Sequence, residues 1–128
     1  RIVDYKTGGN PKIPANIEQL FTPSETRPNY IFQTFLYASI MCRQQTLKVA
    51  PALLYIHRAA SDSYSPVIEM GEPRQPKIPV NNFTFFEDEF RKRLQTLLEE
   101  IFSENEPFTQ TEDIKKCSYC DFKAICKR

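Results

Sequence analysis

The apolar residues of this chain recur at two different spacings, and the order of those spacings limits the folds it can adopt. Residues 1–6 alternate as in a short β-strand, and residues 49–60 have the pattern of a largely buried strand. Between them, a segment from about Asn29 to Gln45 carries apolar residues at helical spacing, and a second helical segment begins at Thr84. The order strand, helix, strand, helix predicts an α/β fold.

Proline-rich segments separate these elements. Residues 12–28 hold three prolines and predict a loop with one helical turn. Residues 61–82 hold four prolines and predict a loop or a short β-excursion. The last helix opens with Thr84, whose hydroxyl is expected to form a capping box with Glu87 three residues later.

The composition is that of a folded protein. The chain has 128 residues, of which 26% are charged and 41% hydrophobic, and this argues against a disordered tail. No stretch approaches the roughly 18 apolar residues of a membrane span, so we expect a soluble, cytoplasmic protein. The formal net charge of +1 gives no bulk attraction for nucleic acid, so such a partner has to be inferred from a site. The basic run at 91–93 has the pattern of a solvated helix face, with a phosphate contact as a secondary interpretation.

Asp4-Tyr5-Lys6 places a carboxylate and an amine two residues apart on one strand. Alternate side chains share a face, so we expect Val3 and Tyr5 to face the core while Asp4 and Lys6 face outward together. A carboxylate that holds a hard divalent cation, beside an amine that orients or deprotonates water, is what metal-assisted phosphodiester hydrolysis needs. An ordinary surface ion pair is the alternative that the tripeptide alone leaves open.

Gln33 and Tyr37 lie four residues apart and therefore share one face of the first predicted helix. An amide and a phenol in adjacent turns can hydrogen-bond a phosphate, a metal-bound water or the catalytic strand. The alternative is an amphipathic helix in which Tyr37 belongs to the core and Gln33 to its rim.

Three of the four cysteines lie near the end of the chain, in a C-x2-C-x5-C arrangement at Cys117, Cys120 and Cys126. Three thiolates at these spacings can wrap one soft metal centre, but the spacing does not decide between zinc and iron–sulfur. Cys42 stands alone among apolar helical residues, where a buried structural thiol is the favoured interpretation. We therefore expect a core of residues 1–113 and a metal-binding tail of residues 114–128.

Taken together, these motifs resemble the PD-(D/E)xK nuclease superfamily. Ile2-Val3-Asp4-Tyr5-Lys6-Thr7-Gly8, then Gln33-x3-Tyr37, then the cysteine tail occur in the family's order across nearly the whole chain. The closest resemblance is to the RecB-type nuclease domains of the AddB group, which share such a tail. The resemblance implies the C-terminal part of a restriction-endonuclease-like fold, a mixed sheet flanked by helices, in a DNA nuclease that depends on Mg2+ or Mn2+.

The resemblance also implies a role for each motif residue. Asp4 would bind the divalent metal, with the Tyr5 carbonyl as a further ligand, and Lys6 would be the catalytic lysine. Gln33 and Tyr37 would support the catalytic residues and the binding of DNA.

By the same resemblance, this chain would be a piece of a longer protein. Cys117, Cys120 and Cys126 would supply three ligands of a 4Fe–4S cluster whose fourth cysteine precedes Arg1. A second metal-binding aspartate would also lie upstream, so the fragment would hold half an active site and be inactive alone.

The expected parent is a helicase–nuclease subunit or an exonuclease that acts on double-strand ends or single strands of DNA in break repair and recombination. A helicase partner subunit or an upstream helicase-like region would accompany it. Three alternatives remain: a CRISPR-associated type of exonuclease, a non-catalytic DNA-binding or assembly module, and a zinc-stabilised structural domain. The sequence upstream of Arg1 would separate these interpretations.

Overall fold

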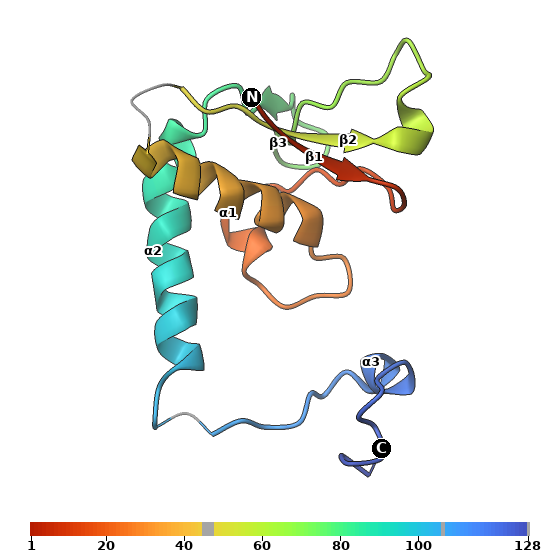
Figure 1. Cartoon of the computed structure of the whole chain (residues 1–128), viewed down its shortest axis with the longest axis vertical. Helices are drawn as coiled ribbons and strands as arrows, with labels where there is room; N and C mark the ends of the chain where they lie inside the picture. Colours follow the sequence, from red (N-terminus) through yellow and green to blue (C-terminus); the bar gives the residue numbers. More distant parts are fainter. Residues whose placement is uncertain (45–47, 106, 128) are drawn as a thin grey trace. The chain divides into compact units, whose positions relative to one another are not determined.

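The fold is described here from a computed structural model, which describes residues 1–44, 48–105 and 107–127. The chain divides into two units, Arg1–Leu98 and Glu99–Arg128. In the first unit, strand β1 (Ile2–Lys6) pairs in parallel with strand β2 (Pro51–Tyr55), and helix α1 (Asn29–Gln44) lies between them in the chain (Figure 1). A parallel pair needs a long crossover, which this helix provides.

The predicted elements of this crossover are largely confirmed. The one helical turn expected in the proline-rich loop is the 3-10 helix η1 (Glu18–Leu20). The predicted helix begins at Asn29 as expected, and its last expected residue, Gln45, lies outside the described residues.

Strand β2 is shorter than the strand predicted at 49–60. The ladder ends where Tyr55 pairs with Lys6, the last residue of β1. Because β1 is followed by Thr7-Gly8-Gly9, it offers no further partner, and the chain continues as the 3-10 helix η2 (Ile56–Arg58).

The excursion that follows β2 returns to it and then forms a small ribbon. Leu53 N–H donates to the Pro66 carbonyl at 2.8 Å, and strands β3 (Glu69–Met70) and β4 (Ile78–Pro79) pair antiparallel. Gly71 begins the connection with a φ of 148°, where a Cβ would lie 3.1 Å from the Pro76 carbonyl oxygen. A larger residue would therefore strain this turn.

Helix α2 (Thr84–Ile101) begins where the sequence predicts, but its cap differs. The Asn82 side-chain oxygen accepts hydrogen bonds from the Thr84 N–H at 3.3 Å and from its hydroxyl at 2.9 Å. The predicted capping box is therefore wrong, because the Thr84 backbone N–H, which the Glu87 side chain would have to cap, donates to Asn82 instead. In the second unit the short helix α3 (Ile114–Ser118) follows. Among the described residues, no helix has both the length and the apolar character to cross a bilayer.

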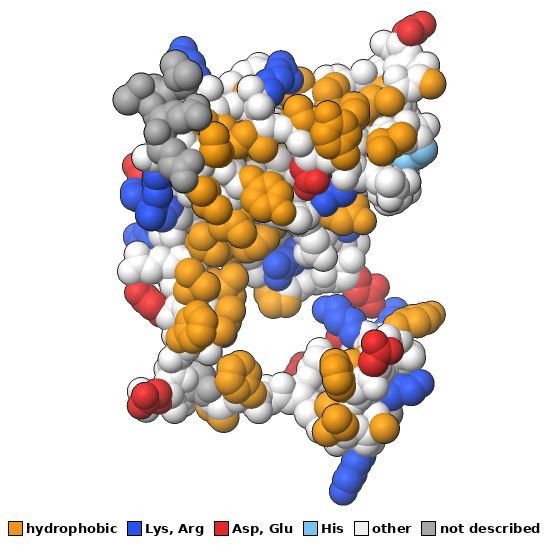
Figure 2. Space-filling model, viewed as in Figure 1, with side chains coloured by type: hydrophobic (Ala, Val, Ile, Leu, Met, Phe, Trp, Pro, Cys, Tyr) orange, Lys and Arg blue, Asp and Glu red, His pale blue; other side chains and the backbone are white. Residues whose placement is uncertain are grey.

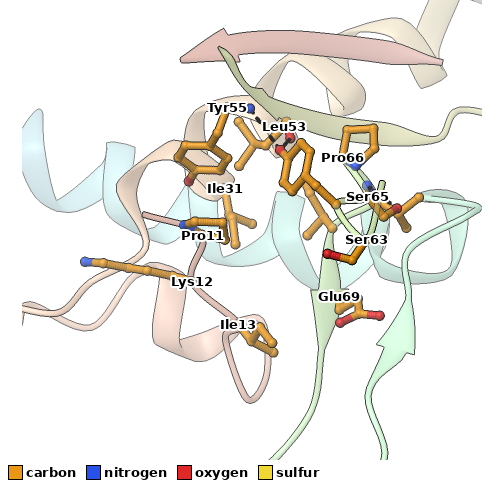
Figure 3. Close-up of a pocket in the computed structure, with 13 residues that line it drawn as sticks. Pro11, Lys12, Ile13, Ile31, Leu53, Tyr55, Ser63, Ser65, Pro66 and Glu69 are labelled. Atoms are coloured by element: carbon orange, nitrogen blue, oxygen red, sulfur yellow. Dashed lines mark hydrogen bonds between the residues drawn. The ribbon is translucent and has the colours of Figure 1, made fainter. Parts of the chain in front are cut away.

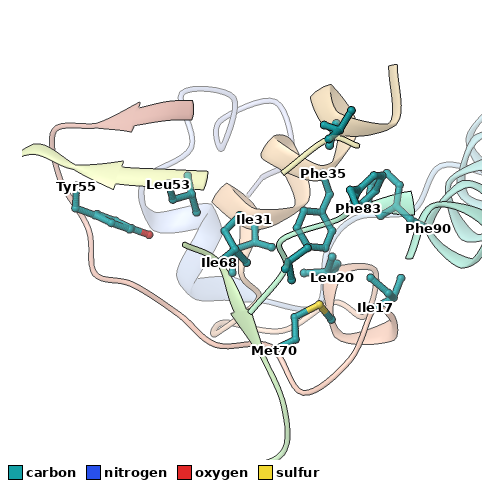
Figure 4. Packing of buried hydrophobic residues seen from close by; sticks show 13 residues of the cluster. Ile17, Leu20, Ile31, Phe35, Leu53, Tyr55, Ile68, Met70, Phe83 and Phe90 are labelled. Carbon is teal, nitrogen blue, oxygen red and sulfur yellow. The ribbon is translucent and has the colours of Figure 1, made fainter. Parts of the chain in front are cut away.

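The core of the first unit is rich in phenylalanine (Figure 4). Phe35 of α1, Phe83 directly before α2 and Phe90 of α2 are fully buried, and the Phe35 and Phe83 rings meet edge to face at 4.9 Å. Ile68 and Met70 of the excursion pack into the same cluster. This packing fixes α1 against the sheet and so determines which side chains of α1 reach β1.

Candidate active site

Asp4 and Lys6 point inward, toward α1. Their side chains are only 16% and 14% exposed, whereas Val3 and Tyr5 are 39% and 63% exposed. The prediction that Val3 and Tyr5 face the core is therefore wrong. Alternation shows which residues share a face but not which face the crossover helix covers, and here α1 covers the face of Ile2, Asp4 and Lys6.

The Lys6 ammonium is held from three directions. Its Nζ lies 2.8 Å from Asp4 Oδ2 and donates to Gln33 Oε1 at 2.7 Å. It also lies over the Tyr30 ring, 4.4 Å from the ring centroid. An ammonium has three protons to donate, so these contacts fix the position of the Lys6 side chain.

The Gln33 amide links Lys6 to Tyr37. Because its oxygen accepts from Lys6, its nitrogen donates to the Tyr37 hydroxyl oxygen, at 2.6 Å. Tyr37 is 41% exposed, so it is neither buried core nor an isolated surface residue. The structure thus brings together the side chains of Asp4, Lys6, Gln33 and Tyr37.

Two further side chains of α1 belong to this cluster but were missed from the sequence. Tyr30 precedes Gln33 by three residues and so lies on the same helical face, a signal that was available. Thr34 is fully buried and donates its hydroxyl proton to the Tyr30 carbonyl at 2.8 Å, with the same oxygen 3.5 Å from Asp4 Oδ2. A hydroxyl has one proton, so the contact with Asp4 is polar packing rather than a strong hydrogen bond.

Asp4 has an oxygen available for a hard cation. Within the described residues, its contacts are all made through Oδ2, and Oδ1 has no partner. The Tyr5 backbone carbonyl follows Asp4 in the chain and is an oxygen of the kind that Mg2+ prefers. The described residues gather no group of three or more histidine, cysteine or acidic side chains that could hold a metal ion, so the Asp4 carboxylate is not part of an acidic cluster. The donor chemistry fits a divalent cation that keeps most of its water.

The geometry therefore combines a D-x-K strand with a glutamine and a tyrosine on the crossover helix. A family model described as PD-(D/E)XK nuclease superfamily matches residues 1–127. The chain belongs to the PD-(D/E)XK nuclease superfamily. No curated protein and no solved structure matches it. Members of this superfamily are typically metal-dependent nucleases, and the α/β arrangement of β1, α1 and β2 is consistent with such a fold.

The three cysteines of the tail do not converge in this PD-(D/E)XK chain. Cys117 lies in α3, the Cys120 N–H donates to the Cys117 carbonyl at 3.1 Å, and all four cysteines are free thiols. Among the described residues they form no group able to hold a metal ion as arranged. Metal sites of this kind commonly fold around their metal, so the sulfurs would have to move together on binding.

Cys42 differs from the tail cysteines. Burial raises the pKa of its thiol, and the nearby Glu87 carboxylate raises it further. A metal ligand must be a thiolate, which these surroundings disfavour. Cys42 packs against the core of the first unit, in keeping with its interpretation as a structural thiol.

A separate cavity of about 270 Å³ lies beside β2 and the excursion (Figure 3). Its Tyr64 hydroxyl accepts a hydrogen bond from the Tyr55 N–H at 2.9 Å and donates to the Leu53 carbonyl at 2.7 Å. Burial, then the neighbouring Tyr64, raises the pKa of Tyr55 and keeps its phenol neutral. These polar groups serve the fold, and none of the residues predicted for catalysis lines the cavity.

Proposed function

We propose that this protein is a metal-dependent DNA nuclease that hydrolyses phosphodiester bonds at the site around Asp4 and Lys6. The observation that carries the proposal is the Lys6 ammonium, held between Asp4 Oδ2 and Gln33 Oε1 on a D-x-K strand. A surface ion pair would not be expected to be more than four-fifths buried and tied to a helix residue. The family match to nucleases supports the same conclusion.

Asp4 would hold the divalent cation through Oδ1, with the Tyr5 carbonyl beside it. The bound cation would supply Lewis-acid chemistry at the phosphate and lower the pKa of bound water. Lys6 would orient the attacking water and stabilise the negative charge that develops on the phosphate.

Tyr37 would contribute a donor to the DNA. Its oxygen accepts the Gln33 amide proton, so its own hydroxyl proton is available to a phosphate oxygen outside the cluster. Gln33 thereby positions both the lysine and the tyrosine.

Tyr30 would act as a positioning residue for Lys6. Replacing Tyr30 with leucine is expected to lower kcat about two- to fivefold, because a partly exposed cation–π contact contributes roughly 0.5–1 kcal/mol. Tyr30→Phe keeps the ring and should retain kcat, and KM should not change in either variant. A fall in kcat for Tyr30→Phe equal to that for Tyr30→Leu would show that the ring does not hold the lysine.

The test of the proposed function is metal-dependent cleavage. The purified full-length protein is incubated with end-labelled single-stranded and double-stranded DNA in EDTA, and then with Mg2+ or Mn2+ in excess. We expect no products in EDTA and cleavage when either metal is added. Asp4→Asn removes the ligand charge and should abolish cleavage at every metal concentration tested. Cleavage in EDTA, or full activity of Asp4→Asn, would contradict the proposal.

We further propose that the protein is of the RecB/AddB type and acts on DNA ends in break repair and recombination, with a helicase partner or region. The support is the combined motif order and the terminal cysteine spacing, in which Cys117, Cys120 and Cys126 would bind a 4Fe–4S cluster in the full-length protein. Iron and zinc analysis of that protein distinguishes this cluster from a zinc site.

A further inference from the structure

A groove of about 550 Å³ lies between the second half of α1 and the outer face of α2. Its apolar floor is built from aliphatic side chains of both helices, Leu36 and Ile40 of α1 and Leu94 and Leu98 of α2. Ile40 and Leu98 are 50% and 45% exposed, so the floor is open to solvent. Figure 2 shows apolar side chains running from α1 onto α2, with Lys and Arg side chains gathered along one edge.

The rim of the groove is positively charged. Arg43 of α1 and Arg91 and Lys92 of α2 line it, against a single carboxylate, Asp88. Asp88 Oδ1 already pairs with Arg91 at 2.7 Å. Within the part of the chain that the structure describes, neither Arg43 nor Lys92 forms an ion pair. Arg43 and Lys92 therefore bring two positive charges to the groove that Asp88, already paired with Arg91, does not neutralise.

The groove is continuous with the candidate active site along α1. Ile40 follows Tyr37 by three residues and Leu36 by four, so it borders both the catalytic face of the helix and the groove. From Gln33 to Arg43 the helix rises roughly 15 Å, so a DNA strand that left the site along α1 would reach these cations within a few nucleotides.

We propose that this groove binds single-stranded DNA next to the cleavage site, with Arg43 and Lys92 on its phosphates. The proposal rests on the proposed function. A positively charged groove that follows the backbone is the usual solution for binding single strands. The apolar floor favours a single strand over a duplex, because only an unpaired strand exposes base faces that can cover it.

The test is binding without cleavage. Anisotropy of a fluorescein-labelled single-stranded oligothymidylate is measured in EDTA over a range of salt concentrations, for Arg43→Gln, Lys92→Gln and the double variant. Each substitution should weaken binding. It should also make the negative slope of log K against log salt shallower by about 0.7, the value of one lost phosphate contact on a single strand. Arg74→Gln, an exposed loop cation of the same unit outside the groove, is the matched control and should leave the slope unchanged.

The other outcomes are equally informative. Unchanged affinity and slope in the double variant would overturn the proposal, as would an equal loss in Arg74→Gln, which would reflect net charge alone. An equal loss on a blunt duplex would overturn the assignment to single strands. If the groove variants bind and cleave DNA like the unsubstituted protein, the groove proposal is wrong and the proposed function stands. If the variants bind DNA more weakly but no form of the protein cleaves DNA with metal, the groove proposal stands and the proposed function is wrong.

Discussion

Replacing Lys6 with alanine is expected to lower kcat for DNA cleavage by about 10²–10³-fold, the range found when one donor to a developing oxyanion is removed. The substitution removes the ammonium that Asp4 and Gln33 hold at 2.8 Å and 2.7 Å. It also leaves a carboxylate, only 16% exposed, without its counter-charge, so some loss of stability accompanies it. The measurement is single-turnover cleavage of end-labelled DNA in Mg2+.

Two controls separate chemistry from folding. Lys48→Ala removes an exposed lysine of the same unit and should retain full activity. DNA binding by Lys6→Ala, measured in EDTA, should stay within about twofold of the unsubstituted protein, because Lys6 is mostly buried and its contacts are internal. Equal cleavage by Lys6→Ala and the unsubstituted protein would remove Lys6 from the mechanism.

The sequence was enough to predict which side chains of the candidate site lie on a common face, but not which face of β1 is covered by α1. The spacings of Asp4 and Lys6 and of Gln33 and Tyr37 fix which side chains share a face, and the structure joins the two pairs through a hydrogen bond from Lys6 to Gln33. Which face of β1 the helix covers depends on long-range packing of α1, which strand alternation does not encode. Val3 and Tyr5 were assigned to the wrong side for this reason.

The same distinction holds for the fold. The starts of α1 and α2 and the turn at η1 follow from local patterns and were predicted. The end of β2 at Tyr55 depends on where its partner β1 stops, which is a tertiary property. The hydrogen bonds to Asn82 were not predicted because Asn82 and Thr84 both carry a side-chain oxygen that can cap α2. Only the backbone path before α2 decides which of the two accepts.

The core that holds α1 in place should be highly sensitive to Phe90. Phe90 is fully buried, and its ring contacts those of Phe21, Phe32, Phe35 and Phe83 at centroid distances of 5.3, 5.7, 6.0 and 5.8 Å. Phe90→Ala is expected to lower the free energy of unfolding by about 3–5 kcal/mol, through lost burial and the cavity left behind. Because small domains are stable by about 5–15 kcal/mol, this is a large fraction of the total.

The same helix provides the matched control, since Phe85 is 83% exposed and Phe85→Ala should change the free energy of unfolding by less than about 0.5 kcal/mol. Denaturant unfolding followed by circular dichroism measures both variants. Phe90 touches Phe32 and Phe35, which flank Gln33 and Thr34 in α1, so the loss should reach the site as well. Cleavage by Phe90→Ala should then fall at temperatures where the protein is still largely folded, whereas Phe85→Ala cleaves normally. Equal stability of the two variants would show that the phenylalanine cluster does not anchor α1.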